Sequence, residues 1–282
     1  MGAALTPVSR LGVCSWSLRP SGPGDLAARV DGCGLRAVQI HLDPIRTGAW
    51  RCDETVGLLR EHRVKIVSGM MSMKGEDYST LDSIRNTGGV RPDSTWDENL
   101  RAAEGNAIFA QRLGLSLVTF HAGFIPHEDG PERERLLDRL SKLAEVFAAR
   151  GVMIALETGQ ETAETLLGVL EALDQRTGPS FRVGVNFDPA NMILYGMGDP
   201  VGAVGVLGPR IVQVHIKDAN PSDSLGEWGS EVPVGRGSVR WKEFFSSLRG
   251  AGFHGNLCIE REAGDTREAD IVLAREFLAS IN

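Results

Sequence analysis

Short apolar runs recur along the chain and are separated by amphipathic stretches. The runs cover residues 11–16, 37–42, 65–70, 117–121, 153–157, 183–188, 211–217 and 256–260. Valine, isoleucine, leucine and alanine nearly fill them, with little alternation between apolar and polar positions. Strands that are buried on both faces of a parallel sheet have this composition, so the runs predict eight parallel strands.

The stretches between the runs have the spacing of amphipathic helices. Leu136, Leu140, Leu143 and Phe147 follow one another at intervals of three and four residues, which places them on one helical face. Gly151 then stands where such a helix must end before the next strand. Because strand and helix alternate throughout without a dividing linker, we predict an α/β fold: a single (β/α)8 TIM barrel over residues 1–282.

One segment departs from this alternation. Residues 71–96 show neither a helical nor a strand period and contain Gly75, Gly88, Gly89 and Pro92. We expect a long loop between the third strand and the next helix. A loop at this place lies on the catalytic face of a barrel, which favours a substrate lid. A plain insertion and an oligomer contact are the alternatives.

Composition and charge narrow the class of protein. The formal net charge of −7 disfavours a protein that binds nucleic acid by neutralising its phosphates. The four cysteines, Cys14, Cys33, Cys52 and Cys258, stand apart in the sequence, which favours reduced core thiols over disulfides or a zinc site. The chain has neither a secretory leader pattern nor a run near the roughly 18 apolar residues of a membrane span. We expect a cytoplasmic protein without nucleic-acid or membrane partners; a homo-oligomer is compatible with the sequence.

Polar residues stand at the ends of the apolar runs, which converge on one face of a barrel. They are Trp16, His41, His121, Glu157, Asp188, His215 and Glu260. Three carboxylates and one imidazole directed at one point repel each other unless a cation lies between them. Mixed oxygen and nitrogen ligands suit manganese, magnesium, cobalt or zinc. The last four of these residues therefore predict a site for one divalent metal ion, with Mn²⁺ as our first expectation.

Several strings around these residues resemble the xylose isomerase-like barrel superfamily, and within it the sugar phosphate isomerase/epimerase group. They are ALET at 155–158, NFDPAN at 186–191, HIKD at 215–218, VGRG at 234–237 and IERE at 259–262. The resemblance implies that Glu157, Asp188, His215 and Glu260 are the metal ligands. It also implies that the two glutamates serve as acid and base.

The resemblance has one departure. Many epimerases and the related endonuclease IV enzymes carry a histidine where this chain has Asn191, and the chain lacks an Asp-x-His pair after the seventh strand. Both absences weaken a DNA-repair interpretation. Dehydratases of the inosose or dehydroshikimate type, which use the same barrel, stay open as an alternative. An endonuclease-like phosphodiester hydrolase or an inactive binding module is less favoured.

The expected reaction is isomerisation or epimerisation of a small sugar, keto-sugar or polyol derivative. One of Glu157 and Glu260 removes the proton next to a carbonyl, an enediolate forms, and the other glutamate lies across the substrate. Trp16, His121, Asn191, Lys217 and Arg236 are the expected substrate-binding residues. The sequence does not choose between epimerisation and isomerisation, and dehydration stays open as the alternative.

Overall fold

The computed structural model describes residues 11–178, 181–224 and 226–281. Its parallel strands pair side by side into a closed barrel in the order β1-β10-β7-β6-β5-β4-β3-β2. These strands are β1 (Leu11–Cys14), β2 (Ala37–His41), β3 (Lys65–Met70), β4 (Leu117–Phe120), β5 (Met153–Glu157), β6 (Gly184–Phe187), β7 (Ile211–Ile216) and β10 (Asn256–Ile259). The predicted (β/α)8 TIM barrel is confirmed, and each strand falls within the run that predicted it.

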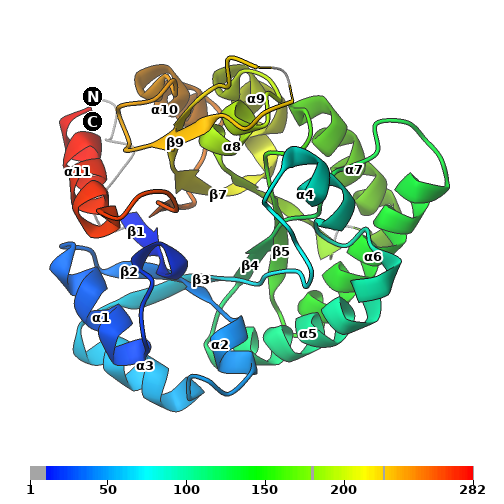
Figure 1. Cartoon of the computed structure of the whole chain (residues 1–282). Helices are drawn as coiled ribbons and strands as arrows, with labels where there is room; N and C mark the ends of the chain where they lie inside the picture. The colour runs from blue at the N-terminus through cyan, green and yellow to red at the C-terminus, as the bar shows by residue number, and fades with distance from the viewer. Residues whose placement is uncertain (1–10, 179–180, 225, 282) are drawn as a thin grey trace.

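Helices surround the barrel (Figure 1). The longer ones are α1 (Pro23–Gly32), α3 (Cys52–Glu61), α5 (Asp93–Arg112), α6 (Pro131–Ala148), α7 (Ala163–Thr177), α9 (Pro200–Leu207), α10 (Trp241–Gly250) and α11 (Arg267–Ser280). Shorter pieces are η2 (Ser15–Leu18), α2 (Asp43–Arg46), α4 (Leu81–Thr87), α8 (Pro189–Leu194) and η4 (Gly208–Arg210). The apolar face predicted for α6 is buried, because Leu136, Leu140, Leu143 and Phe147 all pack into the core.

The interior of the barrel is polar, which the apolar runs did not predict. Side chains alternate across each strand, so Val38 and Ile40 join the apolar core while Gln39 between them bonds to other interior residues. Gln39 Nε2 donates to Thr119 Oγ1 at 2.8 Å, and Ser68 Oγ donates to Gln213 Oε1 at 2.6 Å. These side chains are fully buried, and their mutual hydrogen bonds offset the cost of removing them from water.

The loops at the carboxyl end of the strands are more structured than the sequence indicated. Residues 71–96 were expected to be irregular, but they contain α4, whose first turn is capped by Thr80 Oγ1 accepting from Ser83 N at 2.9 Å. After β7 the chain forms an antiparallel pair, β8 (Asp218–Asn220) and β9 (Ser230–Val232). In Figure 1, α4 and β9 lie in front of the barrel strands.

All four cysteines are buried and free. Among the described residues, no helix combines the length and the apolar character that crossing a membrane would require.

Candidate active site

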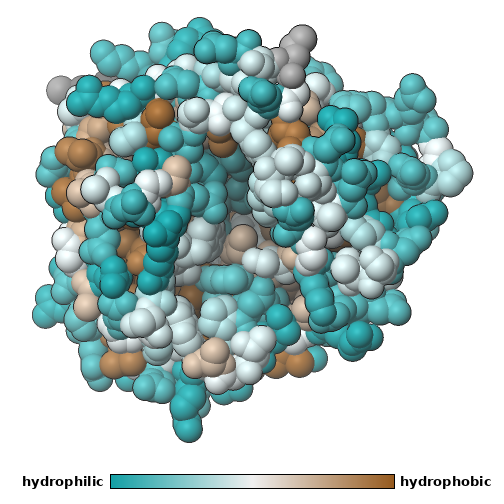
Figure 2. All heavy atoms as spheres, viewed as in Figure 1, coloured by the Kyte–Doolittle hydropathy of each residue, from teal (hydrophilic) through white to brown (hydrophobic). Residues whose placement is uncertain are grey.

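A cavity of about 490 Å³ opens at the carboxyl end of the barrel strands. Figure 2 shows this face of the molecule hollowed near its centre. The cavity is lined by most of the side chains that the sequence singled out: Trp16, His41, His121, Asn191, Lys217 and Glu260. The strand ends therefore meet where the barrel fold requires, on the face that carries active sites in this architecture.

Glu260 connects the cavity to a buried cluster that also contains Glu157, Asp188 and His215. One potential ligand atom from each of the four lies within 4.8 Å of the others. His215 Nδ1 is 3.3 Å from Glu157 Oε1, 3.3 Å from Glu260 Oε2 and 3.8 Å from Asp188 Oδ2. The four residues stand at the ends of four neighbouring strands: Glu157 and His215 lie within β5 and β7, and Asp188 and Glu260 directly follow β6 and β10. The barrel itself therefore brings them together.

Two atoms of the cluster have no hydrogen-bond partner. His215 Nδ1 and Asp188 Oδ2 are both buried and unpaired, and each belongs to a fully buried side chain. Buried polar atoms are rarely left in this state, because the loss of hydration is uncompensated. The donor set of the cluster, one imidazole nitrogen and three carboxylates, fits a divalent cation such as manganese or magnesium. The cluster is therefore a candidate metal centre.

The other ring nitrogen of His215 is fixed from inside the barrel. His215 Nε2 lies 2.8 Å from Gln39 Oε1, which can only accept a hydrogen bond. Gln39 Oε1 is the nearer neighbour of Nε2, since Asn186 Nδ2 lies 3.1 Å away. A neutral imidazole therefore carries its proton on Nε2, which leaves the lone pair of Nδ1 for a cation held between it and the three carboxylates. Orientation of a ligating histidine by a second hydrogen bond is the usual arrangement in protein metal sites.

The two glutamates have different partners. Glu157 accepts from two neutral amides, Asn186 Nδ2 at 3.2 Å and Asn191 Nδ2 at 3.0 Å. Glu260 accepts from Trp16 Nε1 at 2.7 Å and from the charged Lys217 Nζ at 3.0 Å. Glu260 is therefore the more strongly stabilised carboxylate of the pair.

The pKa values follow these partners. Burial opposes ionisation of Glu260, but Lys217 and His215 hold its pKa well below the usual range. The pKa of Glu157 is also lowered, since His121 and His215 outweigh burial. Burial raises the pKa of Asp188 well above its usual value; Lys217 opposes this, and the neighbouring glutamates add to it. Without a cation, the cluster therefore disfavours the ionised form of Asp188. This is expected of a carboxylate whose charge a bound cation would stabilise.

Lys217 and the two histidines at the rim contact acids. Lys217 Nζ lies 3.0 Å from Glu260 Oε2 and 2.8 Å from Glu262 Oε2. His121 Nε2 is 3.6 Å from Glu157 Oε1, and His41 Nε2 is 3.0 Å from Asp43 Oδ2.

Arg236 is the one expected substrate-binding residue that the structure does not bring to this cavity. It is exposed in the turn after β9, outside the described lining. The glycines beside it surround Asp218 instead, since Gly235 N and Gly237 N donate to Asp218 Oδ2 at 2.9 and 3.2 Å. The VGRG string thus supports the β8–β9 loops by binding a carboxylate of the chain, and a role of Arg236 in binding substrate stays a prediction.

The sequence did not single out the other lining residues, most of which lie outside the barrel strands. They are Met70, Ser72, Glu76, Tyr78, Leu194, Tyr195, Trp228, Glu231 and Glu262. Glu76 and Tyr78 belong to the segment 71–96, so this segment reaches the cavity as the lid prediction requires. Their one sequence signal was the length of that segment. Trp228, in the loop between β8 and β9, and Glu231, in β9, had no corresponding signal in the sequence.

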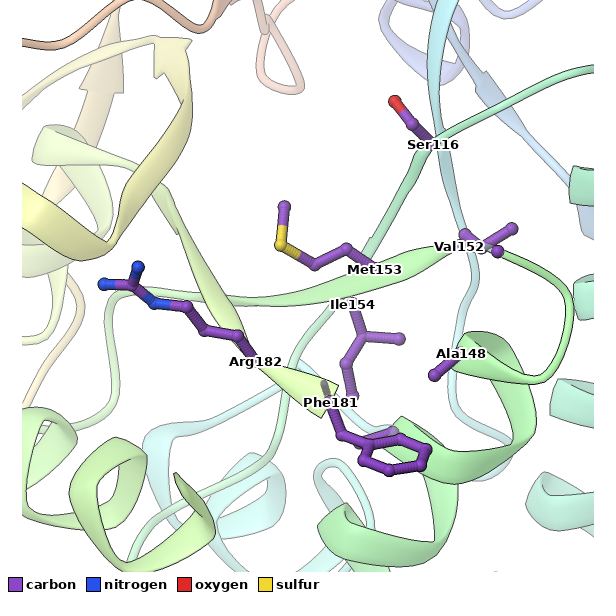
Figure 3. A pocket seen from close by; sticks show the side chains of 9 residues that line it. Ser116, Ala148, Val152, Met153, Ile154, Phe181 and Arg182 are labelled. Atoms are coloured by element: carbon purple, nitrogen blue, oxygen red, sulfur yellow. The ribbon is translucent and has the colours of Figure 1, made fainter. Parts of the chain in front are cut away.

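A second cavity, of about 320 Å³, lies at the opposite end of the barrel. Figure 3 shows Met153 and Ile154 of β5 beside Phe181 and Arg182, which precede β6. Among its described lining residues Arg182 is the one charged side chain. This cavity offers no acid–base pair and no ligand cluster among those residues.

A sequence model of the family described as "Xylose isomerase-like TIM barrel" matches residues 27–281. A xylose isomerase domain protein from Planctomyces limnophilus has a similar structure, with a TM-score of 0.82, 28% sequence identity and 90% of each chain covered. The structure of D-allulose 3-epimerase from Methylomonas sp. aligns with a TM-score of 0.72 at 16% identity, over 97% of this chain and 98% of that chain.

A curated relative, 3-dehydroshikimate dehydratase from Bacillus anthracis, is 26% identical over 170 residues. The match spans 55% of this chain and 59% of the relative's length.

Proposed function

The chain belongs to the xylose isomerase-like TIM barrel family, and we propose that it is a divalent-metal-dependent isomerase or epimerase of a small sugar, keto-sugar or polyol derivative. One observation carries the proposal. The unpaired Nδ1 of His215 faces three carboxylates, and two of these belong to glutamates with separate hydrogen-bond partners. A base and an acid that flank one site are what proton transfer next to a carbonyl requires.

A bound divalent cation polarises substrate oxygens and so acidifies the neighbouring C–H. Glu157, Asp188, His215 and Glu260 would hold it. The chain's own groups then move the proton. Glu157, whose carboxylate is bonded by two neutral amides, is the stronger base of the two glutamates. Glu260, paired with Lys217, completes the acid–base pair.

Positioning and water exclusion fall to the side chains around the cavity. Trp16 is fixed by its bond to Glu260 and presents its ring to the cavity. Asn191 bonds Glu157 with its amide nitrogen and accepts from Lys217 Nζ at 3.3 Å with its amide oxygen. Asn191 thereby joins Glu157 to Lys217, which is itself the hydrogen-bond partner of Glu260. Tyr78 extends from the segment 71–96 over the cavity and lies edge-on to His121, at 6.3 Å between ring centroids.

The test is incorporation of solvent deuterium into ketoses, aldoses and inosose-type ketones by the manganese-loaded protein, followed by NMR. We expect exchange at one carbon with the wild type, and none with Glu157→Gln or Glu260→Gln. Glu145→Gln, at an exposed position on α6, makes the same chemical change outside the cavity and should leave exchange intact. Metal content is measured alongside, and the glutamine variants are compared at full metal occupancy. Exchange near the wild-type rate in either variant contradicts the proposal.

A dehydratase is the alternative, favoured by the similarity to the Bacillus anthracis dehydratase. Both reactions begin with proton abstraction, so the deuterium experiment does not separate them. Product analysis does: a dehydratase loses water and yields an unsaturated product that absorbs in the ultraviolet, whereas an epimer or isomer keeps the substrate's mass.

A further inference from the structure

Carboxylates from three different segments line the cavity above the metal cluster. Glu76 comes from the segment after β3, Glu231 from β9 and Glu262 from the loop after β10. None of the three belongs to the proposed ligand set. The cavity therefore carries acidic groups beyond those that a cation would neutralise.

Lys217 and Arg261, two basic side chains at this end of the barrel, each contact more than one carboxylate. Lys217 is the one lysine among the described lining residues, its side chain is only 5% exposed, and it contacts Glu260, Glu262 and Asp188. No arginine is among those lining residues. Arg261, the neighbour of Glu260 in the chain, divides its guanidinium between Glu231, at 2.7 Å, and Asp270, at 2.9 Å.

The histidines do not supply the missing positive charge. His41 Nε2 lies 3.0 Å from Asp43 Oδ2 and 3.2 Å from Ser72 Oγ. His121 faces Glu157. Each therefore has an acid of its own, and neither is left to pair with an anionic group on a ligand.

One wall of the cavity is aromatic. Tyr195 and Trp228 are packed edge-to-face with their ring centroids 4.7 Å apart, and Leu194 lies beside them in the lining. Because Nε1 of Trp228 is buried, Trp228 presents its ring rather than this N–H to the cavity. The cavity thus offers an apolar wall and several carboxylate acceptors.

We propose that this cavity selects uncharged polyhydroxylated substrates and rejects their phosphorylated and carboxylated analogues; this rests on the proposed function. Hydroxyl groups donate to the carboxylates, and the C–H face of a sugar chain or ring packs on Tyr195 and Trp228. A phosphate carries a charge of about −1.5 to −2 at neutral pH and would enter a site where no cation among the described lining residues is free to receive it. Repulsion between like charges then lowers the affinity for the phosphorylated and carboxylated analogues.

The first test measures binding and does not require turnover. Sorbitol, gluconate and sorbitol 6-phosphate share one carbon chain and differ in end-group charge, and their affinities for the manganese-loaded protein are compared by calorimetry. We expect sorbitol to bind at least about tenfold more tightly than either anion, a ratio that falls as ionic strength rises. An anion that binds as tightly as sorbitol, or sorbitol that does not bind, overturns the proposal.

Substitutions of the lining carboxylates test whether these groups cause the selectivity. Glu76→Gln combined with Glu262→Gln should narrow the ratio between sorbitol and sorbitol 6-phosphate several-fold, because it removes two lining charges and frees Lys217 from one acid. Glu145→Gln, a matched change on the exposed face of α6, should leave the ratio unchanged. An unchanged ratio in the double variant contradicts the assignment to these carboxylates.

The deuterium experiment separates this proposal from the proposed function. Exchange into phosphorylated substrates at the rate of neutral ones would keep the proposed function and remove the selectivity. Selective binding of sorbitol without exchange into any substrate would keep the selectivity and remove the proposed function.

Discussion

The two ring nitrogens of His215 have different neighbours, so the orientation of the ring can be tested by changing one residue, Gln39. Gln39 Oε1 accepts from Nε2 at 2.8 Å, while Nδ1 faces the carboxylates. We predict that Gln39→Leu lowers the affinity for manganese by about 10- to 100-fold, as loss of an orienting partner does in other metal sites. Isothermal titration of the metal-free protein measures this.

A matched control is available in the same interior network. Ser68 donates to Gln213 at 2.6 Å and is not among the hydrogen-bond partners of His215. Ser68→Ala should cost stability without a comparable change in metal affinity. Equal losses of affinity in the two variants would show that the effect is a general loosening of the barrel rather than orientation of His215.

Glu161 gives a prediction about pH. Its carboxyl is buried, and burial raises its pKa to about 8, with a backbone hydrogen bond from Gly159 opposing. A carboxyl with a raised folded-state pKa binds its proton more tightly when folded, so its contribution to stability is complete below the unfolded pKa of about 4.5. That contribution is lost as the pH rises through about 8.

Glu161→Gln removes this ionisation. The wild type should lose a few kcal/mol of stability between weakly acidic and alkaline pH, at about 1.4 kcal/mol per pKa unit. The variant should lose less over the same range and melt at a higher temperature than the wild type at alkaline pH. Thermal unfolding across the pH series measures the difference. Parallel curves for the two proteins would contradict the assigned pKa.

At the residue scale, the convergence of the four cluster residues could be predicted from chain geometry. Glu157, Asp188, His215 and Glu260 could be identified because each ends an apolar run and the barrel closes those ends together. Glu76 could not, since its place in the cavity depends on how a loop folds back. Arg236 was predicted because glycines beside a basic residue resemble an anion site; in the structure these glycines bind Asp218, and Arg236 is not among the residues that line the cavity.

At the scale of elements, the segment after β3 is attached to the barrel through glycine. Gly89 has a positive φ of 67°, and a Cβ there would stand 2.0 Å from the backbone of Ala122. The N–H of Gly89 donates to Glu76 Oε1 at 3.0 Å. The position of Glu76 in the cavity wall therefore depends on the close contact between Gly89 and Ala122. Close approach of these two loops therefore requires glycine.

We predict that Gly89→Ala displaces Glu76 from the cavity wall, raising KM for the substrate found in the exchange screen by more than it changes kcat. Gly48→Ala is the control, because Gly48 has a φ of 81° and a Cβ added there would meet nothing within 4 Å. Both variants suffer the left-handed strain of roughly 1–2 kcal/mol, but only Gly89→Ala adds the clash. A similar KM in both variants would argue against a role for this attachment in the site.

The elements that the sequence missed share a physical cause. Helix α4 has seven residues, Leu81–Thr87, with Ile84 as its buried side chain, so it lacks the repeated apolar positions that mark α6. Strands β8 and β9 have three residues each and, within the described part of the chain, pair with one another and not with the barrel. Their stability depends on tertiary contacts such as the Asp218 turn, and local sequence patterns do not encode those contacts.

For the whole molecule, the buried cluster predicts that folding stability depends on metal. Glu157, Asp188 and Glu260 converge on one point, which costs free energy in the metal-free protein and is offset when a cation binds. A ligand that binds only the folded state at 100 times its Kd adds about 2.7 kcal/mol. Chelation should therefore lower the Tm by several degrees, and added manganese should restore it.

Asp188→Asn distinguishes this from a general effect of salt or chelator. Asp188 Oδ1 accepts from Ala190 N and Asn191 N at the start of α8, and an asparagine oxygen keeps those bonds while the charge at the unpaired Oδ2 is lost. The variant should match or exceed the wild type in Tm without metal, yet gain nothing from manganese. Asp53→Asn, at a side chain that is 92% exposed, should respond to manganese as the wild type does. A cation held by this cluster would lose one of its three carboxylate ligands in Asp188→Asn. If manganese raises the Tm of this variant as much as that of the wild type, the stabilising cation binds elsewhere and the cluster is not the metal site.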